Sequence, residues 1–288
     1  MIQDALLLKP KVKYWLDNLL GKYEVIAPVH TGRMIEYVPI SRGEDALLEF
    51  GTPPLSPKAY FFPKSDLLFT TQSHRGAVTV QPAPVEARER IIFGIRPFDA
   101  RALLIMDKQL IRQNAVDIYY QARRQRTTLV GIGAHQPDVL DFSVSAGSSP
   151  FDEEGLDMLF YDMDKEFYVK VLTEKGKRIL DDNFAPAEEH HRKLAREMKQ
   201  KAEEKAKYEL NLERWKRYTP LEIFQLPYWS EVYLPCIECG ACTFVCPTTV
   251  YSRTVDVEDE GGGGRRVRVW DTPYLERFAV TTEGYNPR

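Results

Sequence analysis

Four cysteines are the residues of this sequence with the clearest chemistry. Cys236, Cys239, Cys242 and Cys246 all fall within eleven residues, and the chain has no other cysteine. They fit C-x2-C-x2-C-x3-C-P, the spacing with which bacterial ferredoxins hold a cubane iron–sulfur cluster. Two residues between ligands let a tight loop fold around one cluster, so successive thiolates reach different irons. The spacing therefore predicts one [4Fe-4S] cluster, with these four cysteines as its metal ligands.

Other uses of the cysteines fit the spacing poorly. A structural zinc site needs two Cys-x2-Cys pairs that usually lie a dozen or more residues apart. A disulfide-bonded secreted chain spreads its cysteines along the sequence. Gly240, inside the run, allows a positive φ that brings the backbone close to a cluster, and Pro247 directs the chain away from it.

The fourth ligand of the cluster is an open question. In two-cluster ferredoxins the last cysteine of this run belongs to the other cluster, and this chain has no second run. Either Cys246 closes the single cluster, or a missing segment or a partner subunit supplies the ligand. We favour closure by Cys246, because a thiolate binds iron better than nearby oxygen ligands do and no unseen partner is needed.

Catalytic residues are not predicted from this sequence, which has no Ser-His-Asp or Cys-His arrangement. Gly131 and Gly133 follow an apolar run, but Gln136 stands where a dinucleotide-binding fingerprint has its third glycine. His190 and His191 lie in a highly charged segment and are expected to be solvated. Arg96, Asp99 and Arg101 either line a cleft or form a helix cap, with Asp99 as the capping residue and the two arginines as its flanking charges.

Composition narrows the class of protein. The chain has 288 residues, 43% of them hydrophobic and 28% charged, with a net charge of −3. This apolar fraction excludes intrinsic disorder, and a near-neutral chain has no net field to attract nucleic acid. No window approaches eighteen apolar residues and the N-terminus lacks a signal-peptide layout, so we expect no membrane span and a cytoplasmic protein.

An α/β domain is predicted over residues 1–185. Apolar runs at 90–95 and 127–132 flank a helix that begins near Ala100, which is typical of a parallel crossover unit. Before this unit we expect an amphipathic helix at 11–20 and short strands at 23–28 and 34–39. After it we expect a strand pair at 158–161 and 167–172.

The remaining chain is expected to form a connector and a cluster module. Residues 187–217 are dense in Glu, Lys and Arg without Gly or Pro, which predicts a long, solvated, charged helix within a helical connector at 186–226. That helix either links two domains or docks a partner. Residues 227–288 are expected to form a ferredoxin-like iron–sulfur module with a C-terminal hairpin around Gly261–Gly264. The fold class is thus α/β or α+β.

Several further motifs point to a known family. They are Ser56-Pro-Lys58 with Phe62-Pro-Lys64, Phe93–Leu103 with Asp107-Lys108, Cys236–Thr248, Arg266–Asp271, and Gly284–Arg288. Together they resemble the iron–sulfur subunit shared by anaerobic sulfite reductase and by sulfhydrogenase-type nickel–iron hydrogenases, where it is the beta subunit.

The resemblance implies an electron-transfer subunit of a multisubunit oxidoreductase. Such a subunit relays electrons between a partner that carries flavin and nicotinamide and a catalytic partner that acts on hydrogen or sulfite, and it is not catalytic alone. Two alternatives stay open. One is an enzyme subunit with its own flavin or substrate pocket in the N-terminal domain, and the other is a scaffold with a redox-silent cluster.

The sequence also departs from this family. Phe98, Ala134-His135 and Asp141-Phe-Ser143 stand where the family has cysteines. Pro-Thr-Thr follows Cys246 in place of Pro-Thr-Cys, and the family's second ferredoxin run would lie beyond Arg288. If the missing cysteines hold a cluster in relatives, this chain lacks it. We therefore expect one cluster instead of a chain of several.

Overall fold

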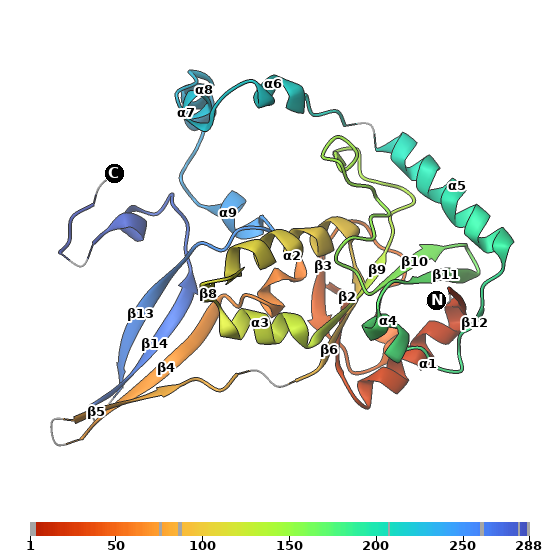
Figure 1. Ribbon diagram of the computed structural model, residues 1–288, viewed down its shortest axis with the longest axis horizontal. Helices are drawn as coiled ribbons and strands as arrows, with labels where there is room; N and C mark the ends of the chain where they lie inside the picture. Colours follow the sequence, from red (N-terminus) through yellow and green to blue (C-terminus); the bar gives the residue numbers. More distant parts are fainter. Residues whose placement is uncertain are drawn as a thin grey trace.

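The main body of the protein is a mixed sheet of eight strands (Figure 1). The computed structural model describes residues 4–74, 77–85, 88–206, 208–259, 262–281 and 283–286. The strand order is β12-β1-β11-β10-β9-β6-β2-β3. The strands are β1 (Ala5–Leu8), β2 (Glu24–Thr31), β3 (Met34–Pro39), β6 (Arg90–Ile95), β9 (Thr127–Ile132), β10 (Met158–Asp162), β11 (Glu166–Val171) and β12 (Ala185–Pro186).

The centre of this sheet is parallel. β2, β6, β9 and β10 pair in parallel, whereas β3 and β11 join antiparallel at either side. β6 and β9 are buried along nearly their whole length, as expected for parallel strands covered on both faces. The chain crosses from β6 to β9 through helices α2 (Pro97–Leu110) and α3 (Ile118–Gln125) and the short ribbon of β7 (Ile111–Arg112) and β8 (Ala115–Val116). The predicted mixed α/β fold and its crossover unit are confirmed.

Two hydrophobic clusters occupy the two faces of the sheet. On one face, α1 (Lys9–Leu20) buries Trp15, whose ring stacks on Phe160 at 5.7 Å and meets Phe93 edge-on at 6.0 Å. On the other face, α2 and α3 bury Leu103 and Tyr120 against the sheet. Short helices at Gly43–Asp45 and α4 (Glu174–Arg178) lie in the connections.

The charged helix is shorter than the sequence predicted. We expected one helix over 187–217, but α5 (Glu189–Lys205) ends at Lys205 and a separate α6 (Leu212–Lys216) follows. The helix extends as far as it packs on the main body: the small residues Ala195 and Ala202 bury one face of α5 against the main sheet. Beyond Ala206, the described apolar side chains up to Trp215 are exposed or half-buried, so little packing supports a longer helix. α6, α7 (Pro220–Phe224) and α8 (Tyr228–Tyr233) lie away from the main sheet (Figure 1).

Two expectations about single residues are corrected. Asp99 does not cap α2: Arg96 is the N-cap residue, Pro97 begins the helix, and Asp99 lies buried in the first turn. His191 is not solvated, because its side chain is buried and its Nδ1 accepts a hydrogen bond from the Glu188 amide. Its neighbour His190 is exposed as predicted.

A second sheet combines strands from both ends of the chain. Its order is β13-β14-β4-β5, with β4 (Ser65–His74), β5 (Ala77–Pro82), β13 (Ser252–Asp259) and β14 (Gly263–Trp270). β13 and β14 form an antiparallel pair, and β14 also pairs antiparallel with β4. Gly261, part of the expected hairpin loop, lies outside the described residues. The division into segments 1–185, 186–226 and 227–288 stays a prediction, and this sheet joins strands from the first and the last of them.

Candidate functional site

The four cysteines lie in one loop and one short helix beside the second sheet. Cys236 and Cys239 follow α8, Cys242 lies in α9 (Ala241–Val245), and Cys246 is the residue at which α9 ends. The first three cysteines are exposed, and Cys246 is half-buried. In Figure 1, α9 lies near the upper ends of β13 and β14, and the ring of Phe244 in α9 stacks on that of Trp270 at the end of β14, with centroids 6.4 Å apart.

The backbone of this loop turns through two left-handed residues. Glu238 has a φ of 55° and Gly240 a φ of 70°, which confirms the positive φ predicted for this glycine. A Cβ on Gly240 would lie 2.5 Å from Cγ2 of Thr272, so the close approach of two chain segments also requires glycine here. The Glu238 amide donates to Sγ of Cys236 at 3.4 Å, an amide-to-sulfur contact of the kind that tunes iron–sulfur clusters.

The donor set fits an iron–sulfur cluster. Four thiol side chains in one loop, with left-handed turns and an amide aimed at sulfur, match what a cubane needs. Within the described ranges, however, no three Cys, His, Asp or Glu side chains gather around one point. The structure thus brings the four predicted ligands into one short segment, a loop followed by α9, and does not arrange them around a common centre.

Cys246 has the most developed surroundings of the four. Burial alone would raise the pKa of its thiol, but hydrogen bonds from Thr248 and Thr249 and the positive charge of Lys58 outweigh it. The pKa of Cys246 is therefore lowered. The distance between Sγ of Cys246 and Oγ1 of Thr248 is 3.2 Å. The lowered pKa favours the thiolate form of Cys246, which is the form that binds metal.

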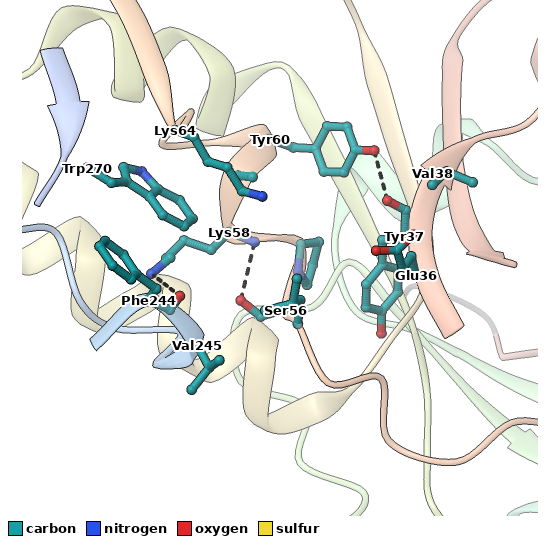
Figure 2. A pocket seen from close by; sticks show the side chains of 13 residues that line it. Glu36, Tyr37, Val38, Ser56, Lys58, Tyr60, Lys64, Phe244, Val245 and Trp270 are labelled. Carbon is teal, nitrogen blue, oxygen red and sulfur yellow. Dashed lines mark hydrogen bonds between the residues drawn. The ribbon is translucent and has the colours of Figure 1, made fainter. Parts of the chain in front are cut away.

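Lys58, far from the cysteines in sequence, also contacts the segment around Cys246 (Figure 2). It lies in the helical turn Pro57–Tyr60 and is only 3% exposed. Its Nζ donates to the carbonyl oxygens of Cys246, Thr249 and Phe244, at 2.8, 3.2 and 3.4 Å. The same atom lies 4.3 Å from the ring centroid of Trp270. Burial lowers the pKa of Lys58 to about 8, and only the negative charge of Cys246 opposes this.

The opposite end of α9 is held by the segment after β14. The hydroxyl of Thr272 donates to that of Thr243, inside α9, at 3.0 Å in a buried contact. Asp271 is 2% exposed and accepts a hydrogen bond from the Thr272 amide. Thr272, directly after the Arg266–Asp271 motif, and Trp270 within it, whose ring stacks on Phe244 at 6.4 Å, therefore support the cysteine segment from this side.

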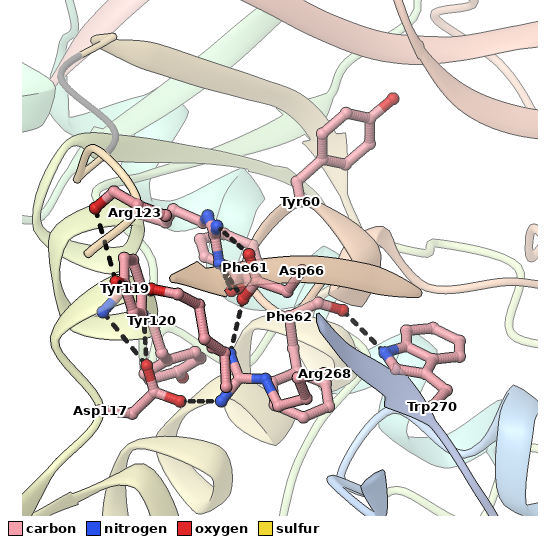
Figure 3. Close-up of polar contacts among 12 residues, drawn as sticks. Tyr60, Phe61, Phe62, Asp66, Asp117, Tyr119, Tyr120, Arg123, Arg268 and Trp270 are labelled. Carbon is pink, nitrogen blue, oxygen red and sulfur yellow. Dashed lines mark hydrogen bonds and ion pairs between the residues drawn. The ribbon is translucent and has the colours of Figure 1, made fainter. Parts of the chain in front are cut away.

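A buried ion-pair network joins β14 to the main body (Figure 3). Arg268 on β14 pairs with Asp66 at 2.6 Å and with Asp117 at the start of α3. Arg123 of α3 binds the same Asp66 through both of its terminal nitrogens, at 2.6 and 3.0 Å. Burial would raise the pKa of Asp66, but the two guanidinium groups lower it on balance. Nε1 of Trp270 also donates to the Phe62 carbonyl at 3.0 Å.

A pocket of about 590 Å³ opens beside the cysteine segment (Figure 2). Phe244 and Val245 of α9 form one wall, and Trp270 and two lysines contribute to the others. The sequence marks Lys58 only as part of a motif, and no sequence signal identifies it as a buried partner of the cysteine segment.

The remaining candidates from the sequence pack the main body or form ion pairs within it. A Cβ on Gly131 or Gly133 would strike Leu156 or Phe151, so these glycines pack the sheet against a loop and form no nucleotide cradle. Arg96 is buried and donates to the carbonyls of Phe50, Gly51 and Ile132. Arg101 pairs with Asp152 at 2.7 Å.

Comparison with known proteins agrees with this site. Residues 235–288, which include all four cysteines, match the family model of a 4Fe-4S dicluster domain. Over an alignment of 268 residues the chain is 25% identical to the sulfhydrogenase 2 subunit beta of Pyrococcus furiosus. The alignment covers 92% of this chain and 77% of that subunit. The chain is thus a distant homologue of a sulfhydrogenase beta subunit over most of its length. No solved structure matches the chain significantly. Among the described residues, no helix is long and apolar enough to cross a bilayer.

Proposed function

We propose that this chain is the electron-transfer iron–sulfur subunit of a hydrogenase-like complex in the cytoplasm. One observation carries the proposal: the four-cysteine run lies within a 4Fe-4S dicluster match, in a chain that aligns with a sulfhydrogenase beta subunit over 92% of its residues. The partners are a subunit that carries flavin and nicotinamide and a catalytic subunit that acts on a small molecule such as hydrogen or sulfite.

Cys236, Cys239, Cys242 and Cys246 would hold one [4Fe-4S] cluster, which supplies one-electron transfer when bound. The chain's own residues bind and orient it. Gly240 and Glu238 turn the loop, and the amide of Glu238 meets the sulfur of Cys236. The exposure of the first three cysteines leaves the loop open to a partner, as relay between subunits requires.

Metal content and turnover test this function. The full chain, prepared anaerobically, should contain about four irons and four sulfides per chain, as one cubane needs. It should exchange electrons with artificial dyes and should not turn over hydrogen, sulfite or a nicotinamide by itself. Zinc at one per chain without iron would refute the cluster, and steady-state nicotinamide oxidation would refute the non-catalytic role.

The fourth ligand is tested at Cys246. A dicluster domain has two clusters, whereas four cysteines suffice for one, so the ligand of the open iron is the point to settle. We propose that Cys246 closes the cluster, and Cys246→Ser should then remove or convert it in the isolated chain. Electron paramagnetic resonance distinguishes the alternative: a wild-type three-iron signal that becomes a four-iron signal only with partners would mean that a partner supplies the ligand.

A second candidate function has one observation in its favour, the pocket beside the cysteine segment. Its volume of about 590 Å³ lies in the range of small-molecule sites, so it suits the alternative of a flavin- or substrate-binding subunit. A visible spectrum of the purified chain separates the two. A flavin band at one equivalent per chain favours this candidate, and its absence together with iron at the expected level favours the relay.

A further inference from the structure

Lys58 has an unusual charge environment for a buried lysine. Removing an ammonium from water is costly unless a carboxylate pairs with it, and buried lysines are rare for that reason. Yet the polar contacts of Nζ are three neutral carbonyls, and no described carboxylate forms an ion pair with it. These three acceptors match the three N–H donors of the group, so its hydrogen bonding is complete without a carboxylate partner among the described residues.

The carbonyls that Lys58 binds belong to the turn that presents Cys246. Phe244 lies in the last turn of α9, Cys246 ends the helix, and Thr249 lies three residues later. Carbonyls at the end of a helix have no partner within the helix and need one from elsewhere. Lys58 supplies that partner for all three from a segment about 190 residues away in sequence.

The motif around Lys58 fixes its own position. Oγ of Ser56 accepts a hydrogen bond from the Lys58 amide at 3.3 Å, and Pro57 begins the helical turn. The lysine stem then passes Trp270, whose ring lies 4.3 Å from Nζ. Each residue of Ser56-Pro-Lys58 thus has a structural role, and each role serves to direct the ammonium at the cysteine segment (Figure 2).

We propose that Lys58 is a positioning residue that fixes the Cys246 turn and provides the positive charge that an anionic iron–sulfur cluster balances. This inference rests on the proposed function. A cluster held by four thiolates carries net negative charge, and reduction adds one more. A buried cation beside it stabilises the reduced form more than the oxidised form, because low dielectric strengthens the attraction. Lys58 therefore raises the reduction potential of the cluster.

Redox titration of the full chain tests the charge. Lys58→Met keeps an apolar stem and removes the ammonium, so the midpoint potential of the cluster should become more negative. Lys58→Arg restores the charge and should move the potential back toward the wild-type value. Lys64→Met is the matched control, since this exposed lysine lines the same pocket and has no hydrogen bond to the cysteine segment among the described residues. Its potential should stay near that of the wild type.

Two results of this titration would overturn the proposal, and one would support it. A cluster retained in Lys58→Met with an unchanged potential overturns the proposal, as does an equal shift in Lys64→Met. Loss of the cluster in Lys58→Met alone, in a chain with wild-type thermal unfolding and far-ultraviolet circular dichroism, supports the positioning role.

Hydrogen exchange in the metal-free chain gives a readout that needs no cluster. If Lys58 fixes the turn, the amides of residues 244–246, 248 and 249 should exchange at least about tenfold faster in Lys58→Met, the effect of losing one hydrogen bond to a charged group. Equal exchange in wild type and variant overturns the positioning role. A wild type that binds no iron defeats the proposed function and leaves this comparison intact, so the two failures are distinguishable.

Discussion

Asp99 shows how burial can dominate the pKa of a single residue. It lies 5% exposed in the first turn of α2, and burial raises the pKa of its carboxyl to about 7, with only the charge of Arg96 opposing the shift. In the unfolded chain an aspartate ionises near pH 4. Between about pH 4 and about pH 7 the folded state therefore binds more protons than the unfolded state. This residue lowers the free energy of unfolding as pH rises through that window.

Asp99→Asn should remove this pH dependence. The amide stays neutral, so the variant should gain stability relative to the wild type as pH rises from about 4 to about 7, and the difference should level off above that. Urea unfolding of both metal-free chains at about pH 4.5, 6 and 7.5 measures it. Asp182→Asn, at an exposed position, controls for loss of one carboxylate. A wild-type-to-variant difference that is constant with pH would contradict the raised pKa.

Gly240 carries two separable constraints, a left-handed φ and a close contact with Thr272. Gly240→Ala should therefore lower the free energy of unfolding by about 1–2 kcal/mol from the backbone term, with the clash in addition. Thr272→Ser in the same chain removes the methyl group that the new Cβ would strike, and should recover the clash part only. Gly32→Ala is the control, since Gly32 has a φ of 69° and a Cβ added there would meet nothing within 4 Å. Urea unfolding checks all three, and equal losses at Gly240 and Gly32 would rule out the contact with Thr272.

At the scale of elements, strand β14 connects the parts of the fold. Along one edge it pairs with β13, and along the other with β4. Arg268 binds Asp66 on the neighbouring strand β4, and Arg268 and Trp270 also reach the main body, where they bind Asp117 and the carbonyl of Phe62. The strand that follows the cysteines in sequence is thus fixed by residues that precede them.

Arg268→Met should destabilise this connection strongly. It leaves Asp117 without the guanidinium and Asp66 with Arg123 alone, and breaking a buried ion pair costs roughly 3 kcal/mol. Arg266→Met on the same strand is the matched control, because its pair with Asp256 is exposed and should contribute little. Thermal and urea unfolding give the comparison. Equal effects of the two substitutions would show that the buried network adds nothing beyond a surface pair.

At the scale of the whole molecule, sequence patterns predicted the parts that depend on local or continuous signals. The apolar runs of β6 and β9 and the one-sided helix α1 were predicted because burial on both faces, or on one, leaves a periodic record. β4 and β5 were missed because they are largely exposed and alternate weakly. The pairing of β4 with β14 spans about 190 residues, and a single sequence carries no signal for it.

In the candidate site, too, the local features were predictable from sequence and the contacts made by distant residues were not. The four cysteines are evident from spacing, and their role as ligands stays a prediction. The partners that hold them were not predictable, since Lys58 and Thr272 touch α9 only through the folded chain. Asp99 was assigned to the wrong position because a helix-capping residue and a buried first-turn residue differ by only a few positions in sequence.

The iron–sulfur segment should therefore depend on the rest of the chain to fold. A fragment of residues 227–288 retains all four cysteines, but it lacks β4 beside β14, Lys58 beside Cys246, and both carboxylates that bind Arg268. A two-stranded hairpin alone is marginally stable in water, so we expect this fragment to be unfolded without metal and to bind iron weakly or heterogeneously. The full chain under the same reconstitution should hold about four irons. Amide dispersion in a two-dimensional NMR spectrum and iron content decide the comparison, with the full chain carrying Cys242→Ser as the control for adventitious iron. A fragment with dispersed amides and four irons would show that residues 227–288 form an independent domain, and that the second sheet is a contact between two finished units.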